Sequence, residues 1–449
     1  MSVNAKVVIV GCGISGIAAA HKLVNAGFQH VRILEATARS GGRIKTGTFG
    51  RKLNAEDIFP AEQLFYELIY ESSKCESQGG ETWACVGDFI RSEAEQQAAK
   101  KWTDIDAATR CLRLCVISNM LKLECCFNGA HSMDEVSLGA YGRYKTLPGQ
   151  DCTFPGGYEG LVKSLMSELP TDLVTYNRPV RCVHWNNTEK KENSVMIECD
   201  DEKIDADHVI VTVPLGYLKK HHSTLFSPHL PQHKLHSVER LGFGTTNVIY
   251  VEFDSPWWDA ECENIYLVWE DEDGMVDQVP DVQRSWIKKL FGFTVLKPTE
   301  RYGHVLCGWI AGHESEYMET LSEQEVTHTM TQLIRRFKGN PSITPRRVLR
   351  SQWFHDPWTC GSYSYPGIGC SAQDLENMIE PLPTNGSLLQ PLQVLFAGEA
   401  THPCYFSTVH GALLTGWREA DRLISHYSSI STSNDLKGAV YVLKQVRGL

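Results

Sequence analysis

Three glycines near the N-terminus have the spacing that brings a protein backbone against phosphate. Gly11, Gly13 and Gly16 follow an apolar segment at residues 7–10, and Glu35 comes nineteen residues after the last glycine. The first glycine permits a tight turn, the second lets a pyrophosphate approach the backbone, and the third lets a helix pack closely on the strand. Free N–H groups at the start of that helix attract phosphate. A carboxylate in the place of Glu35 can accept hydrogen bonds from ribose hydroxyls, so the pattern predicts a dinucleotide site.

A second glycine pair follows this unit. Gly41 and Gly42 lie between Arg39 and Arg43. The two glycines permit another close approach of the backbone, and Arg43 can form paired hydrogen bonds with phosphate oxygens. The alternative interpretation is an ordinary glycine turn with a surface arginine. Taken with the first unit, the pair favours a dinucleotide whose diphosphate is bound twice, as in FAD.

Another candidate unit lies near the C-terminus. An apolar segment leads into Gly398 and Glu399, and Ser407, Thr408 and Val409 then precede a helical pattern. A helix N-terminus that points at a ring carbonyl stabilises negative charge on the ring when the ring is reduced. The Glu399 carboxylate could accept hydrogen bonds from sugar-alcohol hydroxyls. The alternative is a plain strand-to-helix connection capped by serine or threonine.

The remaining patterns supply the elements that would position these residues. Apolar residues at helical spacing occupy much of 55–128 and return at 161–169, 323–337 and 409–427. Strand-like segments lie at 7–10, 31–34, 180–185, 194–199, 206–213 and 392–397. Serine becomes frequent after Tyr427, so the tail is expected to be held loosely. This order of strands and helices predicts an α/β fold.

Composition and charge limit the kind of protein and its partners. The 449 residues suffice for two domains with sizeable cores. A formal net charge of −11 argues against nucleic acid or an anionic membrane as the main partner and is compatible with a cationic substrate. Fifteen cysteines without paired CxxC spacing indicate reduced thiols. Cys125 and Cys126 are expected in the core, since no histidine pattern accompanies them, and no metal site is predicted.

The sequence also gives an expectation about the compartment. No segment approaches the roughly 20 apolar residues of a membrane span, and no secretory signal precedes the first strand. We expect a cytoplasmic monomer. The chain ends in Arg447, Gly448 and Leu449, a weak form of the C-terminal peroxisomal signal, so the peroxisome is the alternative.

Further strings of residues occur in an order typical of one enzyme family. They lie at residues 34–44, 123–126, 131–134, 151–154, 209–216, 240–245, 306–308, 361–365 and 417–423. On these motifs the chain resembles the flavin-containing amine oxidases, and among them first the N-acetylpolyamine oxidases and then the spermine oxidases. The resemblance covers nearly the whole chain.

This resemblance implies a fold and a cofactor. A discontinuous Rossmann-like FAD-binding domain would be formed by residues 1–50, 170–215 and 349–430. A substrate domain of mixed sheet and helices would be formed by residues 51–169 and 216–348, with residues 431–449 as a flexible tail. The implied reaction is oxidation of N-acetylspermine, N-acetylspermidine or spermine by hydride transfer to flavin. O2 is then reduced to hydrogen peroxide, and the imine is hydrolysed to an aldehyde and a shorter amine.

The resemblance also assigns roles to residues. FAD would be held by Gly11, Gly13, Ser15, Gly16, Glu35, Arg39, Gly41, Gly42, Arg43, Val180, Trp353, Gly398, Glu399, Thr408 and Val409. Trp353 and Tyr363 would face the flavin ring. Glu124, Tyr144, Ser407 and Thr408 would line the amine channel. Tyr363, Thr408 and Glu124 are the catalytic candidates, with Glu124 binding a charged nitrogen away from the reacting carbon. Without the resemblance, Tyr363 is typical of a core aromatic and Glu124 of a structural carboxylate.

Two departures from the family pattern bear on catalysis. After Gly50 the family continues with a strand that lies against the flavin and carries a histidine, whereas residues 51–59 pass directly into a helical pattern here. The family also has a lysine where Val248 stands, and valine offers no donor to hold a water at the flavin. The alternative function is therefore a catalytically impaired, flavoprotein-like binding protein or a shortened isoform. A nicotinamide dehydrogenase is a more remote alternative.

Overall fold

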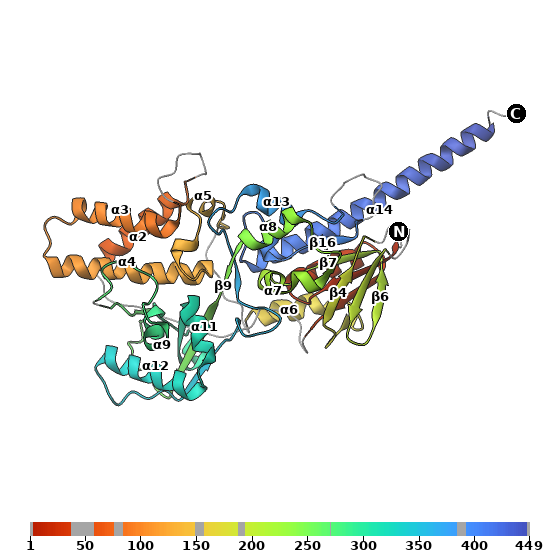
Figure 1. The fold of residues 1–449 in the computed structure, drawn as a ribbon. Coiled ribbons are helices and arrows are strands. Elements are labelled where there is room, and N and C mark those ends of the chain that lie inside the picture. The colour runs from red at the N-terminus through yellow and green to blue at the C-terminus, as the bar shows by residue number, and fades with distance from the viewer. Residues whose placement is uncertain are drawn as a thin grey trace.

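Figure 1 shows the molecule as two lobes, one around a parallel sheet and one of helices beside an antiparallel sheet. The computed structural model describes residues 3–36, 58–75, 84–148, 157–186, 194–269, 271–383 and 392–446. Each lobe is formed by segments that are far apart in the sequence.

The parallel sheet collects strands from the beginning, middle and end of the chain. Its order is β16-β7-β1-β2-β3. The apolar residues 7–10 of the first strand are at most 7% exposed, because the strand has a neighbour on either side and an apolar core against each of its faces. The strands are β1 (Val3–Val10), β2 (Phe28–Leu34), β3 (Val174–Thr175), β7 (His208–Val211) and β16 (Val394–Phe396).

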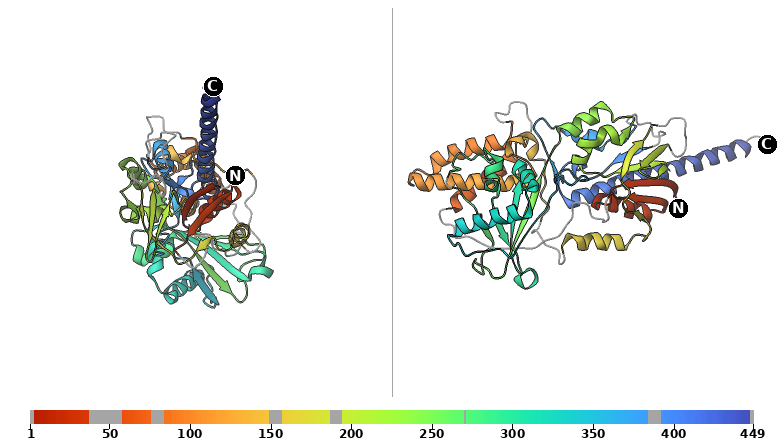
Figure 2. Two further views of the ribbon diagram at one scale, coloured as in Figure 1. Left: turned by 90° about the vertical axis from the view of Figure 1, so that its right-hand side faces the viewer. Right: turned by 60° about the horizontal axis from the view of Figure 1, so that its bottom comes forward.

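Two helices cross closely on one face of this sheet. They are α1 (Ile14–Asn25) and α14 (Val409–Val446). A side chain at Gly416 would begin 2.2 Å from the Ser15 carbonyl oxygen, so only glycine permits this approach. The structure continues α14 to Val446, where the sequence predicts a loose tail, because the segment contains no proline that would end the helix. The far end of α14 extends beyond the lobe (Figures 1 and 2).

A smaller sheet and three helices complete the lobe. The sheet has the order β6-β5-β4-β8 and shares one apolar core with the parallel sheet. Its elements confirm the predicted strands near residues 180 and 195. The elements are β4 (Val180–His184), β5 (Val195–Cys199), β6 (Lys203–Ala206), β8 (Phe226–Ser227), α7 (Leu215–Leu225), α8 (Gln232–Arg240) and α13 (Ala372–Ile379).

The second lobe contains a five-stranded sheet of order β11-β12-β13-β10-β14. Its inner face and α12 enclose a separate apolar core. The predicted helix at 323–337 is confirmed as α12, which starts with a Ser322–Glu325 capping box. The elements are β10 (Thr246–Phe253), β11 (Asn264–Tyr266), β12 (Gly292–Val295), β13 (His304–Ala311), β14 (Arg347–Arg350), α11 (Gly312–Thr320) and α12 (Glu323–Lys338).

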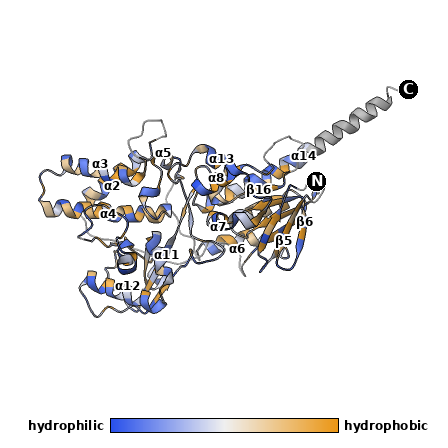
Figure 3. Ribbon diagram, in the orientation of Figure 1, coloured by the Kyte–Doolittle hydropathy of each residue, from blue (hydrophilic) through white to orange (hydrophobic). Residues whose placement is uncertain are grey.

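Three longer helices confirm the helical pattern expected between residues 55 and 128. They are α2 (Phe59–Ser72), α3 (Val86–Lys101) and α4 (Ala107–Asn128). Their apolar residues face one another, while polar residues alternate with them on the surface (Figure 3). A short pair, β9 (Gly242–Gly244) with β15 (Tyr363–Tyr365), lies between this helical group and the parallel sheet.

The remaining described elements are short. They are α5 (Leu138–Tyr141), α6 (Tyr158–Ser167), α9 (Val282–Ser285), α10 (Thr299–Tyr302), η1 (Met133–Glu135), η2 (Trp286–Lys289) and η3 (Glu399–Thr401). The fourteen cysteines within the described ranges are all free thiols, as the sequence predicts. In the described part of the chain, no helix has the length and apolar character needed to cross a membrane.

Candidate functional site

One cavity of about 370 Å³ opens at the carboxyl ends of the parallel strands. Ligands of open α/β sheets bind at this edge. The lining comes from the N-terminal turn, the middle segment and the C-terminal unit. It includes these residues predicted from the sequence: Gly11, Gly13, Ser15, Glu35, Val180, Tyr363, Gly398, Glu399, Ser407, Thr408 and Val409.

The glycine turn has the geometry that its spacing predicts. Gly11 has a φ of +101°, which favours glycine. A side chain at Gly16 would begin 2.1 Å from the Gly11 carbonyl oxygen. At Gly13, by contrast, no atom of the other described residues lies within 4 Å of that position. The described residues therefore leave space at the start of α1, in which a phosphate can approach its N–H groups.

Glu35 lies in the cavity wall directly after β2. The side chain is buried, and its Oε2 accepts a hydrogen bond of 2.8 Å from the Cys12 N–H. Burial and the nearby Glu35 raise the pKa of the Cys12 thiol to about 12. Cys12 therefore stays protonated at neutral pH, and Glu35 is the acidic group of this turn.

In the C-terminal unit, a second buried carboxylate, that of Glu399, holds the neighbouring segments together. Glu399 Oε2 accepts hydrogen bonds from the Ser364 hydroxyl at 2.6 Å and from the Ser407 N–H at 2.7 Å. Ser407 has a φ of +64°, unusual for a residue with a side chain. Thr408 Oγ1 accepts from the Gly411 N–H at 3.0 Å and thereby caps the first turn of α14. The start of α14 is thus directed into the cavity.

Tyr363 lies in β15, and its side chain is held by residues at the C-terminal end of α4. Its hydroxyl donates to the Cys126 carbonyl, and a side chain at Gly129 would begin 2.7 Å from its ring. Trp353 does not line the cavity, whereas Trp358 does. The prediction that Trp353 faces the cofactor gains no support from this placement.

Several cavity residues were missed by the sequence reasoning. They are Tyr158, Arg178, Tyr217, Asp356 and Trp358. They come from four separate places in the chain, Asp356 and Trp358 sharing one, and no spacing pattern connects the four. Arg39, Gly41, Gly42 and Arg43 lie outside the described residues.

Family models match most of the chain. One described as flavin containing amine oxidoreductase matches residues 91–424, and one described as NAD(P)-binding Rossmann-like domain matches residues 9–60. The chain belongs to the flavin-containing amine oxidoreductases. The family and the N-terminal dinucleotide unit together identify the cofactor as FAD.

Individual relatives of this flavin-dependent family match over nearly their full length. The peroxisomal N(1)-acetyl-spermine/spermidine oxidase of Bos taurus is 40% identical over 488 residues, covering 94% of each chain. The human protein of the same name is 41% identical, covering 94% of this chain and 95% of its own. Cyclohexylamine oxidase from Brevibacterium oxydans IH-35A has a similar fold, with a TM-score of 0.65 at 17% identity, covering 95% of this chain and 100% of that chain. Because the bovine alignment is longer than the 449 residues of this chain, part of that relative lies opposite gaps here.

Glu124 lies on α4, shortly before Gly129, which packs against the Tyr363 ring. It does not line the cavity. Its carboxylate accepts hydrogen bonds from the Tyr141 hydroxyl at 3.1 Å and from Asn128 Nδ2 at 3.2 Å. Burial raises the pKa of Glu124 to about 7. A carboxyl of this kind gains a charge readily when a cation approaches, because the cation offsets the cost of burial.

Tyr144, the other predicted channel residue, lies at the surface. It is 42% exposed, and its ring meets Phe406 edge to face at 5.6 Å. The backbone N–H of Lys145 donates to the Cys404 carbonyl at 3.0 Å. Tyr144 therefore lies beside the segment that leads to Ser407, outside the cavity itself.

Val248 and the described cavity lining bear on the two departures noted in the sequence. Val248 lies in β10, where its N–H donates to the Ser351 hydroxyl at 2.9 Å. Among the described residues that line the cavity there is neither a histidine nor a lysine. The described lining therefore offers hydroxyl, carboxyl and guanidinium groups near the cofactor, with no imidazole or amine.

Proposed function

We propose that the protein is an FAD-dependent oxidase of polyamines, with N-acetylspermine, N-acetylspermidine and spermine as substrate candidates. The observation that carries the proposal is the single cavity that joins the glycine turn, Glu35 and the Glu399–Val409 unit. Two mammalian relatives that match the whole chain are named for acetylated spermine and spermidine. The net charge of −11 favours the approach of a cationic substrate.

The described residues fit FAD at both ends of the cavity. The diphosphate would lie at Gly13, where the described residues leave space, and the Glu35 carboxylate in the cavity wall would accept from the adenosine ribose. Glu399 and the start of α14, which line the same cavity, would hold the ribityl chain and the ring. When bound, the flavin supplies the acceptor for a hydride from the carbon beside an amine nitrogen, and O2 accepts the electrons to give hydrogen peroxide.

The protein side chains position the amine. Tyr363, held by the Cys126 carbonyl, provides an aromatic wall for the uncharged nitrogen, whose neighbouring carbon donates the hydride. Ser407 and Thr408 bring hydroxyl groups to the same wall. Glu124 is proposed to bind a second, charged nitrogen away from the reacting carbon, because an ion pair with a buried carboxylate is strong.

The alternative is a protein that binds flavin or amine but oxidises slowly. It is favoured by one observation, the absence of histidine and lysine from the described cavity lining. The Val248 side chain has no donor that could hold a water near the flavin ring.

One spectroscopic experiment separates these functions. The visible spectrum of the purified protein is recorded without oxygen, before and after addition of N1-acetylspermine. Bleaching of a bound flavin band, followed by peroxide formation when air is admitted, supports the oxidase. A flavin band that stays unbleached supports the binding protein. The absence of a band contradicts both and supports a shortened isoform that has lost its cofactor.

Compartment and assembly are part of this proposal. Both mammalian relatives are named peroxisomal, which favours the peroxisome over the cytoplasm. Imaging of a fluorescent fusion at the N-terminus tests this, since it leaves residues 447–449 free. A monomer of 50.4 kDa is expected, and light scattering during size-exclusion chromatography measures it.

A further inference from the structure

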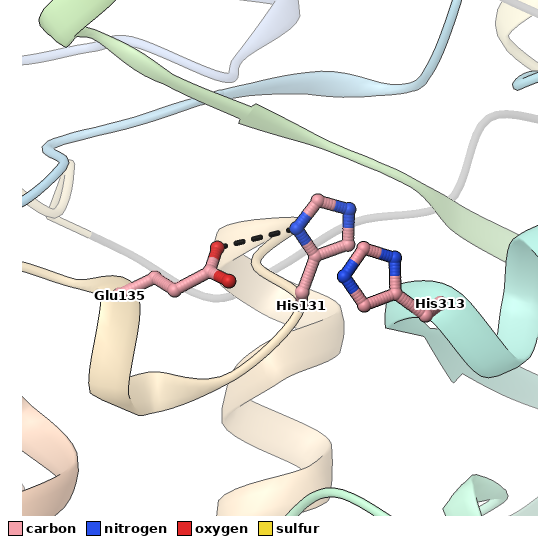
Figure 4. A group of neighbouring side chains, drawn as sticks. All are labelled: His131, Glu135 and His313. Atoms are coloured by element: carbon pink, nitrogen blue, oxygen red, sulfur yellow. Dashed lines mark hydrogen bonds and ion pairs between the residues drawn. The ribbon is translucent and has the colours of Figure 1, made fainter. Parts of the chain in front are cut away.

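Two histidines and two glutamates meet outside the cofactor cavity, in the lobe with the antiparallel sheet. His131 follows α4, and Glu135 ends η1. His313 and Glu316 lie in the first turns of α11. Figure 4 shows the two imidazole rings beside one another, with the Glu135 carboxylate facing the His131 ring.

Three of these residues have the spacing of ligands around one small ion. The candidate ligand atoms of His131, Glu135 and His313 all lie within 4.8 Å of one another. His131 Nδ1 is 3.2 Å from Glu135 Oε2. Two ligands bonded at about 2.0–2.1 Å to a tetrahedral ion are roughly 3.3 Å apart, so a metal fits between these two atoms.

Glu316 supplies the outer carboxylate that such a site requires. Its Oε1 is 2.9 Å from His131 Nε2, and its Oε2 is 2.9 Å from His313 Nδ1. A histidine that binds a metal generally donates its other ring N–H to a carboxylate, which fixes the tautomer and the direction of the ring. Here one carboxylate serves both rings and leaves His131 Nδ1 and His313 Nε2 as the ligand atoms.

Neighbouring groups hold the side chains of Glu135 and His131 in place, whereas the His313 ring can change its orientation. Glu135 is held by the Tyr365 hydroxyl at 2.6 Å, and the His131 side chain is only 17% exposed. The two rings are stacked at 4.0 Å, whereas a metal must lie near the plane of each ring that binds it. The His313 side chain is 58% exposed, so its ring has room to tilt toward the ion.

We propose that His131, Glu135 and His313 bind one divalent transition-metal ion, Zn²⁺ being the best match, and that Glu316 orients both imidazoles. Two imidazoles and one carboxylate with an open fourth position are a known zinc ligand set. The sequence predicts no metal site, because these ligands come from segments that are joined only in the fold. The bound ion would tie the loop after α4 to the start of α11, in addition to the existing hydrogen bonds.

The test measures Zn²⁺ binding to the full chain by calorimetry after treatment with a chelator. Accessible thiols are first blocked, because partly exposed cysteines such as Cys360 also bind zinc. His313→Leu removes an exposed ligand, and Glu316→Gln removes the outer carboxylate. His328→Leu is the matched control, since His328 is an exposed histidine on α12, outside the cluster.

The proposal expects one Zn²⁺ per chain for the unmodified protein and for His328→Leu. Saturable binding should disappear in His313→Leu and weaken about 10–100-fold in Glu316→Gln. Zn²⁺ should also raise the unfolding midpoint only in the proteins that bind it. Absence of saturable binding, or equal binding in His313→Leu, overturns the proposal and leaves the cluster as a network of ion pairs. Circular dichroism of each variant verifies that it is folded.

Discussion

Glu124 is a buried carboxyl whose charge changes near neutral pH. Because burial raises its pKa to about 7, it is largely neutral at pH 6 and largely ionised at pH 8. If it binds the distal ammonium group of a polyamine, kcat/KM should rise with pH through this range. In Glu124→Gln, kcat/KM should be lower, by about tenfold or more at pH 8, since a hydrogen bond to a charged group contributes about 1.5–3 kcal/mol. The pH profile of both proteins measures this.

The amine substrate titrates as well, so a control must separate the two effects. A monoamine has the reacting nitrogen but no distal charge, and the Glu124→Gln change should leave its profile unaltered. An equal loss for the monoamine and the polyamine would contradict the role of Glu124 in binding the second nitrogen. Glutamine keeps an acceptor for the Tyr141 hydroxyl, so folding is preserved.

Gly13 and Gly16 form a matched pair for the cofactor site. A methyl group at Gly13 meets no described atom within 4 Å, whereas at Gly16 it would begin 2.1 Å from the Gly11 carbonyl oxygen. Gly13→Ala should therefore retain the unfolding free energy of the apoprotein while losing bound flavin. Gly16→Ala should lose flavin and also be destabilised, by about 1–3 kcal/mol. Urea unfolding and flavin absorbance per chain are the two measurements, and full flavin content in Gly13→Ala would contradict the predicted phosphate contact.

Much of the candidate site could be predicted at the level of residues. Gly11, Glu35 and Glu399 were found because a local spacing required them, and all three line the cavity. Trp358 and Arg178 could not be found in this way, because only the long-range arrangement of the chain brings them there. The role of Trp353 was assigned by resemblance alone and stays a prediction, while Trp358 of the same segment lines the cavity.

At the level of elements, Glu319 determines the path of the segment that leads to Trp358. Its buried carboxylate accepts hydrogen bonds from the N–H groups of Trp353, Phe354 and His355, at 2.8–2.9 Å. Asn247 in β10 donates to it as well, at 2.6 Å. The end of α11 thus holds the loop against the sheet through one side chain.

Glu319→Ala should leave these donors without a partner. We expect a loss of about 3–5 kcal/mol in the free energy of unfolding, because several donors lose a charged acceptor and each such hydrogen bond contributes about 1.5–3 kcal/mol. Glu323→Ala is the control, because Glu323 is exposed on the neighbouring helix α12. Equal stability of the two variants in urea unfolding would show that the loop does not depend on Glu319.

Element types were predicted best where the apolar pattern is strong. The helices between residues 59 and 128 and strands such as β4 and β5 follow from periodicity. Short elements such as β9 and β15 escaped prediction, because three residues contain too little pattern and their pairing is fixed by distant contacts. The helix α14 also continues beyond its predicted end at Tyr427, where the serines resemble a loop although the segment contains no proline.

For the whole molecule, cofactor binding and stability should be coupled. The cavity joins three separate parts of the chain, so bound FAD contacts the native state alone. Added FAD at about a hundred times its dissociation constant should stabilise the protein by about 2.7 kcal/mol. Thermal scans of the apoprotein over a range of FAD concentrations measure this. FMN, which lacks the adenosine end, serves as the control and should stabilise less. Equal effects would contradict the role of Glu35.

The strand order of the parallel sheet has a consequence for synthesis on the ribosome. β1 lies between β2 and β7, yet β7 begins only at His208. At about 5–20 residues per second, roughly 10–40 seconds pass before the second neighbour of β1 exists. During this time the nascent chain exposes an apolar strand edge of the kind that promotes aggregation. We therefore expect newly made chains to need a chaperone that covers such edges, whereas the finished enzyme, with β1 enclosed, does not.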